Sequence, residues 1–262
     1  MWDIESYKQF YDYYEKESLS KERIAHFERV CSLVLKMIGS ENPGGASLRI
    51  ADIGCGAGTQ SLVWAKHGHS VFGLDLNKPL VELAKKRSLE NGYDIKLILG
   101  SATNIPLHDG AIDVCLVEDL LEHVENWKSC LDEFRRILKP GGTLFLTTTN
   151  KLCPRQEEFN LPLYSWYPAF LKRYFLKLVL TNRPGIANYA KYPAFNWFCF
   201  YGLRRALSSR GFFCLDRFSL IDISGKNKFL KGMLFLIKKV FIFNFLAHMV
   251  TPYTQILGIK NK

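Results

Sequence analysis

The feature that most constrains the fold is a glycine-rich stretch, Ala51 to Thr59, that directly follows an apolar run. Its three alternate glycines let the chain turn sharply and let a ligand approach the backbone more closely than side chains would allow. The stretch predicts a strand that turns into a helix over Gln60 to His67, whose first amides face the ligand. The next predicted strand, Ser70 to Leu74, is followed by Asp75, and a carboxylate there suits the two hydroxyls of a ribose. Together these features indicate a nucleoside-binding α/β fold.

The spacing of the glycines narrows the choice of nucleoside. Dinucleotide-binding turns have the pattern G-x-G-x-x-G, whereas this chain has G-x-G-x-G at Gly54, Gly56 and Gly58, with Asp52 two positions ahead. The arrangement resembles motif I of the class I S-adenosylmethionine (SAM) methyltransferases, in which an acid at the position of Asp75 binds the cofactor ribose. The resemblance implies that SAM is the cofactor.

The next segments continue this resemblance. A third predicted strand, Ile95 to Leu99, leads into a loop similar to the family's adenine-binding loop, with Ser101 in place of the usual aspartate. A fourth, Ile112 to Val117, is continuously apolar, as expected for a strand buried on both faces. A Pro-Gly-Gly turn at 140–142 leads into a fifth, Thr143 to Thr147. The cofactor contacts that the resemblance implies are Asp52, Gly54, Cys55, Gly56, Gly58, Asp75, Leu76, Ser101, Ala102 and Glu118.

Strands that alternate with helical stretches predict right-handed βαβ units. We therefore expect an α/β fold, a Rossmann-like, doubly wound sheet of seven strands with helices on both faces. Six strands are parallel in this prediction, and the resemblance implies that the seventh, Thr254 to Lys260, pairs antiparallel with a sixth over Phe213 to Ile223. The expected organisation is an N-terminal helical lid in 1–47, the SAM-binding core in 48–150, a basic and aromatic insertion in 151–200, and the rest of the core in 201–262 with an amphipathic insertion at 226–250.

Two acids and a histidine follow the fourth predicted strand. Asp119, Glu122 and His123 lie in a stretch similar to the E-x-L-E-H-V sequence of the ubiquinone-biosynthesis O-methyltransferases, with Asp119 in place of the first glutamate. In that family these positions are associated with a divalent metal and the reacting hydroxyl. The resemblance implies that the three residues are catalytic and that they hold Mg²⁺, which prefers carboxylate oxygens. Two alternatives stay open: His123 is a general base without a metal, or the stretch is structural.

Charge is distributed unevenly along the chain. Residues 1–150 carry 17 basic and 21 acidic side chains, whereas residues 151–262 carry 18 basic and 4 acidic ones. A positive half of this kind favours an anionic partner, either a membrane surface or a nucleic acid, with a merely solvated basic face as the alternative. No nucleic-acid-binding module is recognisable. We therefore expect an anionic membrane surface as partner and not a nucleic acid.

Two segments of the basic half mix basic and large apolar side chains. Residues 228–247 contain no acid, and a helical projection gathers four lysines within an arc of about 100°. These are Lys228, Lys231, Lys238 and Lys239. Lysines near the bilayer centre cost about 2.5–3.5 kcal/mol each, so the pattern favours a helix that lies in the membrane interface over one that spans it. A buried helix whose lysines face water is the alternative. The second candidate surface lies between Lys151 and Trp197, where residues 163–168 and 170–177 interleave aromatic and basic residues.

Other features bear on the location and the substrate. The seven cysteines are scattered and form no C-x-x-C pair, as expected in a reducing cytoplasm, and the first residues do not resemble a signal peptide. We predict a cytoplasmic protein that associates peripherally with the membrane. Before a predicted helix over Lys21 to Met37 lie five aromatic residues that either line a substrate pocket or pack on the sheet. These are Tyr7, Phe10, Tyr11, Tyr13 and Tyr14.

These patterns together predict a SAM-dependent methyltransferase (EC 2.1.1 class) that acts on a small, lipophilic molecule. The acceptor that the resemblance and the amphipathic segment favour is a polyprenylated quinol or phenol, methylated on oxygen. The alternatives are a lipid-linked sugar or another envelope precursor, RNA, and a SAM-binding subunit without turnover. Because the methyl group of a sulfonium is already activated, such an enzyme mainly has to align the acceptor and exclude water.

Overall fold

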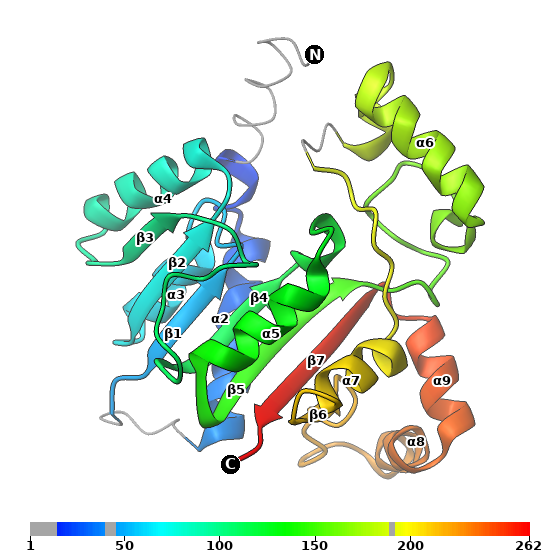
Figure 1. Cartoon of the computed structure of the whole chain (residues 1–262). Coiled ribbons are helices and arrows are strands. Elements are labelled where there is room, and N and C mark those ends of the chain that lie inside the picture. The colour runs from blue at the N-terminus through cyan, green and yellow to red at the C-terminus, as the bar shows by residue number, and fades with distance from the viewer. Residues whose placement is uncertain (1–14, 40–45, 189–191) are drawn as a thin grey trace.

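The computed structural model describes residues 15–39, 46–188 and 192–262. A seven-stranded sheet lies at its centre, in the order β3-β2-β1-β4-β5-β7-β6 (Figure 1). Its strands are β1 (Arg49–Ile53), β2 (Ser70–Asp75), β3 (Lys96–Leu99), β4 (Ile112–Glu118), β5 (Leu138–Thr149), β6 (Phe212–Asp216) and β7 (Tyr253–Lys260). The α-helices are α2 (Lys21–Ile38), α3 (Thr59–Lys66), α4 (Lys78–Glu90), α5 (Trp127–Ile137), α6 (Ala169–Thr181), α7 (Phe200–Ser208), α8 (Lys228–Lys239) and α9 (Phe241–Met249). Short 3₁₀ helices cover η1 (Leu121–His123), η2 (Tyr164–Trp166) and η3 (Pro184–Ala187).

The direction of the strands confirms the predicted fold class. Strands β1 to β5 are parallel to one another, and β7 is antiparallel to both β5 and β6. Six strands therefore share one direction and the seventh opposes them. All the carboxyl ends of the parallel strands meet at one edge of the sheet, where ligands bind in folds of this kind.

Apolar side chains from helices cover both faces of the sheet. On one face α2, α3 and α4 contribute Val34, Trp64 and Val81 to one buried cluster. On the other face α5 and α7 contribute Phe134 and Leu203 to a second cluster; Figure 1 shows these two helices in front of the sheet and α2 behind it. Burial of one such side chain contributes about 1.5–3 kcal/mol relative to exposure. The central strands are apolar because both of their faces are covered in this way.

Helix α2 forms close to where the sequence predicts it. Ser20 caps its start by accepting a hydrogen bond from the amide of Arg23, and Gly39, with φ of 71°, ends it in the left-handed conformation. The helix runs from Lys21 to Ile38, one residue beyond the prediction. The five N-terminal aromatic residues singled out in the sequence lie outside the described residues, as do residues 1–14 and 40–45 of the segment expected to form a lid.

Two expectations about the C-terminal part were wrong in their extent. The sixth strand ends at Asp216 instead of continuing to Ile223, because the Asp216 carboxylate accepts hydrogen bonds from the amide and hydroxyl of Ser219 and so turns the chain. Residues 228–247 do not form one helix: Val240 adopts an extended conformation (φ −109°, ψ 117°) and separates α8 from α9. The two helices connect β6 to β7.

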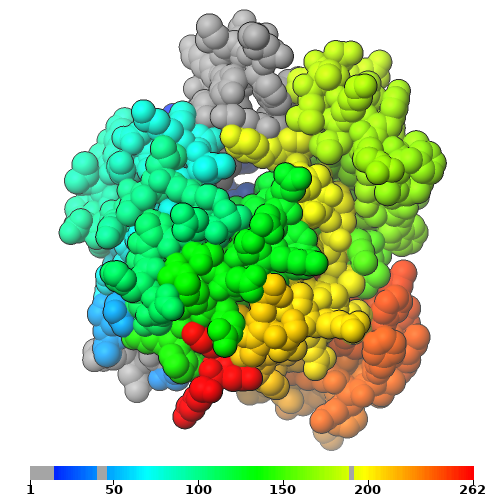
Figure 2. Space-filling view, in the orientation of Figure 1, coloured from blue at the N-terminus to red at the C-terminus, as the bar shows by residue number. Residues whose placement is uncertain are grey.

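The segment between β5 and α7 has a small core of its own. Phe159, Tyr164 and Val179 are buried there with two alanines, and the rings of Phe159 and Tyr164 stack with centroids 4.0 Å apart. Helix α6 closes this core and lies beside the carboxyl edge of the sheet in Figure 1. Figure 2 shows a hollow at that edge, between the cyan and green surface on one side and the yellow stretch near residue 195 on the other. The division of the chain into a lid, a SAM-binding core, an insertion and a C-terminal part of the core remains a prediction.

Among residues 15–39, 46–188 and 192–262, none of the helices combines the length and apolarity that crossing a membrane requires.

Replacement of Phe134 by alanine tests the core under α5. Phe134 is fully buried (0% exposed), whereas Phe213 on β6 is 58% exposed and offers a matched control. We expect Phe134→Ala to lower the free energy of unfolding by about 3–5 kcal/mol, and Phe213→Ala to lower it by about 1 kcal/mol or less. Urea denaturation measures both. Equal losses would contradict the packing of α5 against the sheet.

Candidate cofactor and acceptor site

The glycine-rich loop joins β1 to α3 at the carboxyl edge of the sheet. Gly54, Gly56 and Gly58 have φ angles of 82°, 51° and 77°, in the left-handed region that favours glycine. The amide of Gly54 donates to the carbonyl of Leu74 (2.7 Å), which ties the loop to β2. A Cβ atom on Gly58 would lie only 2.8 Å from that of Ala84 in α4. The loop therefore depends on glycine both for its conformation and for the close approach of α4.

Asp75, at the end of β2, faces this loop. Its Oδ2 accepts a hydrogen bond from the amide of Gly56 (2.9 Å) and its Oδ1 accepts one from the amide of Asn77 (2.7 Å). Burial raises the pKa of Asp75, and these amide bonds act in the opposite direction by stabilising the charge. The next side chain, Leu76, is exposed. An anchored carboxylate thus stands beside an open apolar surface.

The other predicted cofactor residues of the first two βα units lie around the loop. Asp52 is buried below it and accepts a hydrogen bond from Ser61 Oγ of α3 (2.6 Å); burial raises the pKa of Asp52 to about 7. Cys55 turns its thiol into the core, where a Cβ on Gly73 would be 3.2 Å from the sulfur. These two side chains support the loop from inside, so a ligand would meet only the backbone of Cys55.

The loop after β3 approaches Asp75 from the other side. The amide of Gly100 donates to the carbonyl of Asp75 (2.9 Å), so the two loops lie together. Ser101 Oγ is 2.8 Å from Thr103 Oγ1, and Ala102 is buried. The structure therefore brings the predicted ribose-binding and adenine-binding positions to one place.

Glu118, at the end of β4, is held by two residues that sequence reasoning missed. Its Oε1 accepts from Gln60 Nε2 of α3 (2.6 Å), and its Oε2 lies 2.7 Å from His26 Nε2 of α2. Burial raises the pKa of Glu118, whereas the bond to His26 lowers it. Gln60 follows the glycine motif and could have been noticed from its place, but nothing in the spacing of the sequence connects His26 to this site.

Asp119 follows Glu118 in an uncommon backbone conformation. Its φ of 50° is positive although it is not glycine, and such strain is concentrated at functional sites. Thr147 on β5 holds it, because the Asp119 amide donates to the Thr147 carbonyl (3.2 Å) and Thr147 Oγ1 donates to Asp119 Oδ1 (3.0 Å). The side chain of Asp119 is exposed at the edge of the sheet.

Glu122 and His123 each present one buried polar atom that finds no hydrogen-bond partner among the described residues: Oε1 of Glu122 and Nδ1 of His123. The other oxygen of Glu122 accepts from Thr148 Oγ1 (2.8 Å). Burial, together with Asp119, raises the pKa of Glu122 well above its ordinary value. Burial lowers the pKa of His123, whose ring also hydrogen-bonds to the backbone of residues 192 and 193.

The predicted Mg²⁺ site is not supported. Within the part of the chain that the structure describes, no three or more His, Cys, Asp or Glu side chains are placed to hold a metal ion. The reason is local: Glu122 turns inward to Thr148, whereas Asp119 is bound to Thr147 at the surface. The three predicted ligands are neighbours in the sequence, but their donor atoms do not converge on one point.

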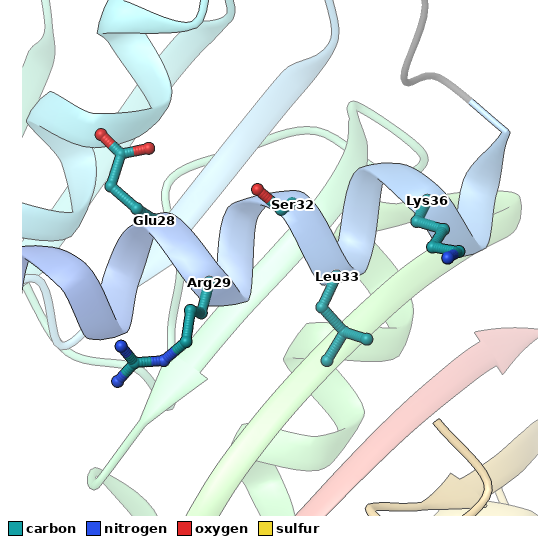
Figure 3. A pocket seen from close by; sticks show the side chains of 5 residues that line it. All are labelled: Glu28, Arg29, Ser32, Leu33 and Lys36. Atoms are coloured by element: carbon teal, nitrogen blue, oxygen red, sulfur yellow. The ribbon is translucent and has the colours of Figure 1, made fainter. Parts of the chain in front are cut away.

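A separate hollow of about 390 Å³ lies along the side of α2. Figure 3 shows the side chains that line it, which are Glu28, Arg29, Ser32, Leu33 and Lys36. It includes none of the predicted site residues. The predicted cofactor residues therefore lie at the edge of the sheet, away from this hollow.

Comparison with known proteins agrees with the geometry of this edge. The model of a family described as methyltransferase domain matches residues 51–146. The chain is 30% identical over 151 residues to the ubiquinone biosynthesis O-methyltransferase of Colwellia psychrerythraea, which covers 57% of this chain and 59% of that protein. It is 31% identical over 111 residues to the malonyl-acyl-carrier-protein O-methyltransferase of Serratia marcescens, with 42% and 41% covered. The chain spans about half the length of the curated relatives it matches.

Solved structures resemble the whole chain at low sequence identity. A SAM-dependent methyltransferase from Methanosarcina mazei has a TM-score of 0.54 and 19% identity, covering 86% of this chain and 97% of its own. A protein from Pyrococcus horikoshii has a TM-score of 0.59 and 15% identity, covering 96% and 99%. At these identities the likeness concerns the fold alone.

The strand order, the geometry of the glycine loop and the family match lead to one conclusion: a methyltransferase domain lies over residues 51–146, and the chain has the Rossmann-like fold of class I SAM-dependent methyltransferases.

Proposed function

We propose that the protein transfers a methyl group from SAM to a hydroxyl oxygen of a lipophilic acceptor, with a polyprenylated quinol or phenol as the acceptor class. The observation that carries the proposal is the pair of buried polar atoms, Glu122 Oε1 and His123 Nδ1, that no described residue completes. Such atoms cost free energy unless a ligand pairs with them. The names of the curated relatives, both O-methyltransferases, support oxygen as the accepting atom.

The residues around the glycine loop fit SAM. Asp75 would accept hydrogen bonds from the ribose hydroxyls while the amides of Gly56 and Asn77 hold it in place. The exposed Leu76 would pack on the adenine, and Ser101 and Ala102 would border it from the next loop. When bound, SAM supplies a methyl group that its sulfonium already activates. The protein therefore contributes placement and the exclusion of water.

His123 would act as the general base. Because burial lowers its pKa, the imidazole is neutral near pH 7 and Nδ1 is able to accept the proton of the acceptor hydroxyl. Glu122 Oε1 lies on the neighbouring residue and would pair with the acceptor. A phenolic hydroxyl has an ordinary pKa of about 10, so removal of its proton makes the oxygen a better nucleophile. No step passes through a metal ion, since the donor atoms do not converge.

We further propose that the protein is cytoplasmic and attaches peripherally to an anionic membrane surface through α8, α9 and α6. Phe229 on α8 is 81% exposed and Phe241 on α9 is 68% exposed, whereas most soluble surfaces avoid large contiguous apolar patches. The other exposed apolar residues from α8 to the residue after α9 are Met233, Phe235, Leu236, Val240, Ile242, Phe243, Leu246 and Val250. In Figure 1, α6 and the α8–α9 pair lie on the same side of the sheet. Lysines beside such aromatic residues suit lipid headgroups.

A lipid-linked sugar or another envelope precursor is the second candidate, and a cluster of acids favours it. Glu158 lies near Asp119 and Glu157, and burial together with these charges raises the pKa of Glu158 to about 7. Tyr253 donates to Glu157 Oε2 (2.6 Å). Several carboxyl oxygens at one edge suit the hydroxyls of a sugar. The same carboxylates would repel the phosphates of RNA, which argues against an RNA acceptor. A SAM-binding subunit without turnover would not require acids at the acceptor side, which argues against that alternative too.

Asp75→Asn tests the cofactor site. Loss of the carboxylate charge weakens its hydrogen bonds to the ribose, so we expect the affinity for S-adenosylhomocysteine to fall about 10- to 100-fold. Titration calorimetry measures it. Asp94→Asn, an exposed surface change, is the matched control and should bind like the wild type. Equal affinities in all three proteins would remove Asp75 from the site.

His123→Asn tests the base, with release of S-adenosylhomocysteine measured on a prenylated quinol in anionic liposomes. We expect kcat to fall about 10²- to 10⁴-fold while S-adenosylhomocysteine still binds. In the wild type the rate should fall only at a pH below the ordinary imidazole pKa of about 6.5, because burial lowers the pKa at which the His123 ring gains a proton. The variant should lack this limb. His108→Asn at the surface is the control. An unchanged profile would exclude His123, and turnover only on a lipid-linked sugar would favour the second candidate.

Removal of two lysines tests the membrane surface. Each lysine near an anionic leaflet contributes about 1 kcal/mol, so Lys228→Gln with Lys231→Gln should weaken binding to anionic liposomes about 30-fold. Co-sedimentation at physiological salt measures the binding. The matched control is Lys85→Gln with Lys86→Gln on α4, which removes the same charge elsewhere. Absence of binding by the wild type would refute the proposed attachment without affecting the chemistry.

A further inference from the structure

The first described residues of the chain contact the cofactor loop directly. Thr59 Oγ1, at the first position of α3, donates to the carbonyl of Ser18 (2.9 Å). On the other side of the loop, His26 of α2 pairs with Glu118 (2.7 Å). Residues 15–26 are thus attached at two points to the elements that position the cofactor, although they precede the glycine motif by about thirty residues in the sequence.

Arg87 strengthens this attachment from α4. Its buried guanidinium donates through Nη2 to the carbonyl of Glu15 (2.7 Å), and through Nη1 to Ser18 Oγ (3.0 Å) and to the carbonyl of Ala57 (3.2 Å). Ala57 lies between Gly56 and Gly58, within the loop itself. One planar, five-donor group therefore holds the loop and the N-terminal segment at the same time. A lysine at this position, with a single nitrogen, would not reproduce the fork.

The bond at Glu118 makes a second link between the same two parts. Gln60 of α3 holds one oxygen of the carboxylate (2.6 Å), and His26 holds the other. A ligand that fixes the start of α3 also fixes Gln60. Gln60 in turn fixes the carboxylate of Glu118, which binds His26 near the start of α2. The two links stand on opposite sides of the glycine loop, one from α4 and one from β4.

We propose that Arg87 is a positioning residue that couples the cofactor loop to residues 15–26, so that SAM and this segment stabilise each other's placement. The inference rests on the proposed function, because it requires the cofactor at the loop. A ligand that fixes the carbonyl of Ala57 also fixes the acceptor of one Arg87 hydrogen bond, which favours the other two. Such coupling is reciprocal: the segment in place raises the affinity for the cofactor by the same factor.

Hydrogen exchange with S-adenosylhomocysteine as probe tests the coupling. In the wild-type chain we expect saturating S-adenosylhomocysteine to slow the exchange of the amides in residues 15–26 by about tenfold or more. Arg87→Lys keeps the charge but loses the paired guanidinium nitrogens. In this variant S-adenosylhomocysteine should no longer slow the exchange of residues 15–26, and its affinity should fall about tenfold. Lys86→Gln removes the neighbouring side chain, which is 67% exposed, and should behave like the wild type.

A purely structural role gives a different result. It would raise exchange in Arg87→Lys equally with and without the probe, and that outcome would overturn the proposal. Thr59→Val loses only the Ser18 bond and should retain part of the slowing, which keeps the test valid if Arg87→Lys folds poorly. If the wild type binds the probe by calorimetry but its exchange does not change, the coupling is refuted and the proposed function stands. If the wild type does not bind the probe, both are refuted.

Discussion

The site depends above all on the hydrogen bonds that fasten the glycine loop to the end of β2. The Gly54 amide is fixed on the Leu74 carbonyl, and the Gly56 amide on the Asp75 carboxylate. Strands β1 and β2 are a parallel pair, so their carboxyl ends lie at the same edge of the sheet. The sheet therefore determines where the loop amides point. The positive φ angles, the close packing of Ala84 and the shape of the ligand surface all follow from this attachment. A side chain at Gly58 would disturb it from α4, even though no strand changed.

The ionisable side chains form two regions of different character, one with buried acids and one with exposed lysines. At the carboxyl edge of the sheet, burial raises the pKa values of Asp52, Glu118 and Glu122. The raised pKa values shift these three groups toward their neutral forms. The C-terminal half carries an excess of 14 positive charges, and the four lysines of α8 share that helix with the exposed rings of Phe229 and Phe235. One region is suited to a small polar reaction centre and the other to an extended anionic surface.

The sequence predicted the elements whose cause is local and missed those whose cause is tertiary. The glycine spacing, Asp75 and the apolar run of β4 placed the sheet and the cofactor loop well, because each signal is contained within one strand and its turn. The sixth strand was made too long, since its alternating pattern continues past Asp216 whereas a side-chain bond to Ser219 ends it. The metal site failed for a related reason: Asp119 and Glu122 are close in sequence, yet different threonines of β5 turn them apart. Arg87 and His26 left no sequence signal, because a basic residue on a helix ordinarily faces water.

The place of α8 and α9 within the sheet connectivity has a mechanical consequence. They leave β6 and return directly into β7, whose first residues, Tyr253 and Thr254, pair with Thr149 and Thr148 of β5. Thr148 in turn holds the carboxyl group of Glu122. A displacement of the end of α9 would therefore reach Glu122, on the proposed acceptor side, through β5, which pairs with β7 and whose next residue, Asn150, donates to the carbonyls of His248 and Thr251. The proposed membrane surface and the proposed nucleoside site are therefore anchored on different strands.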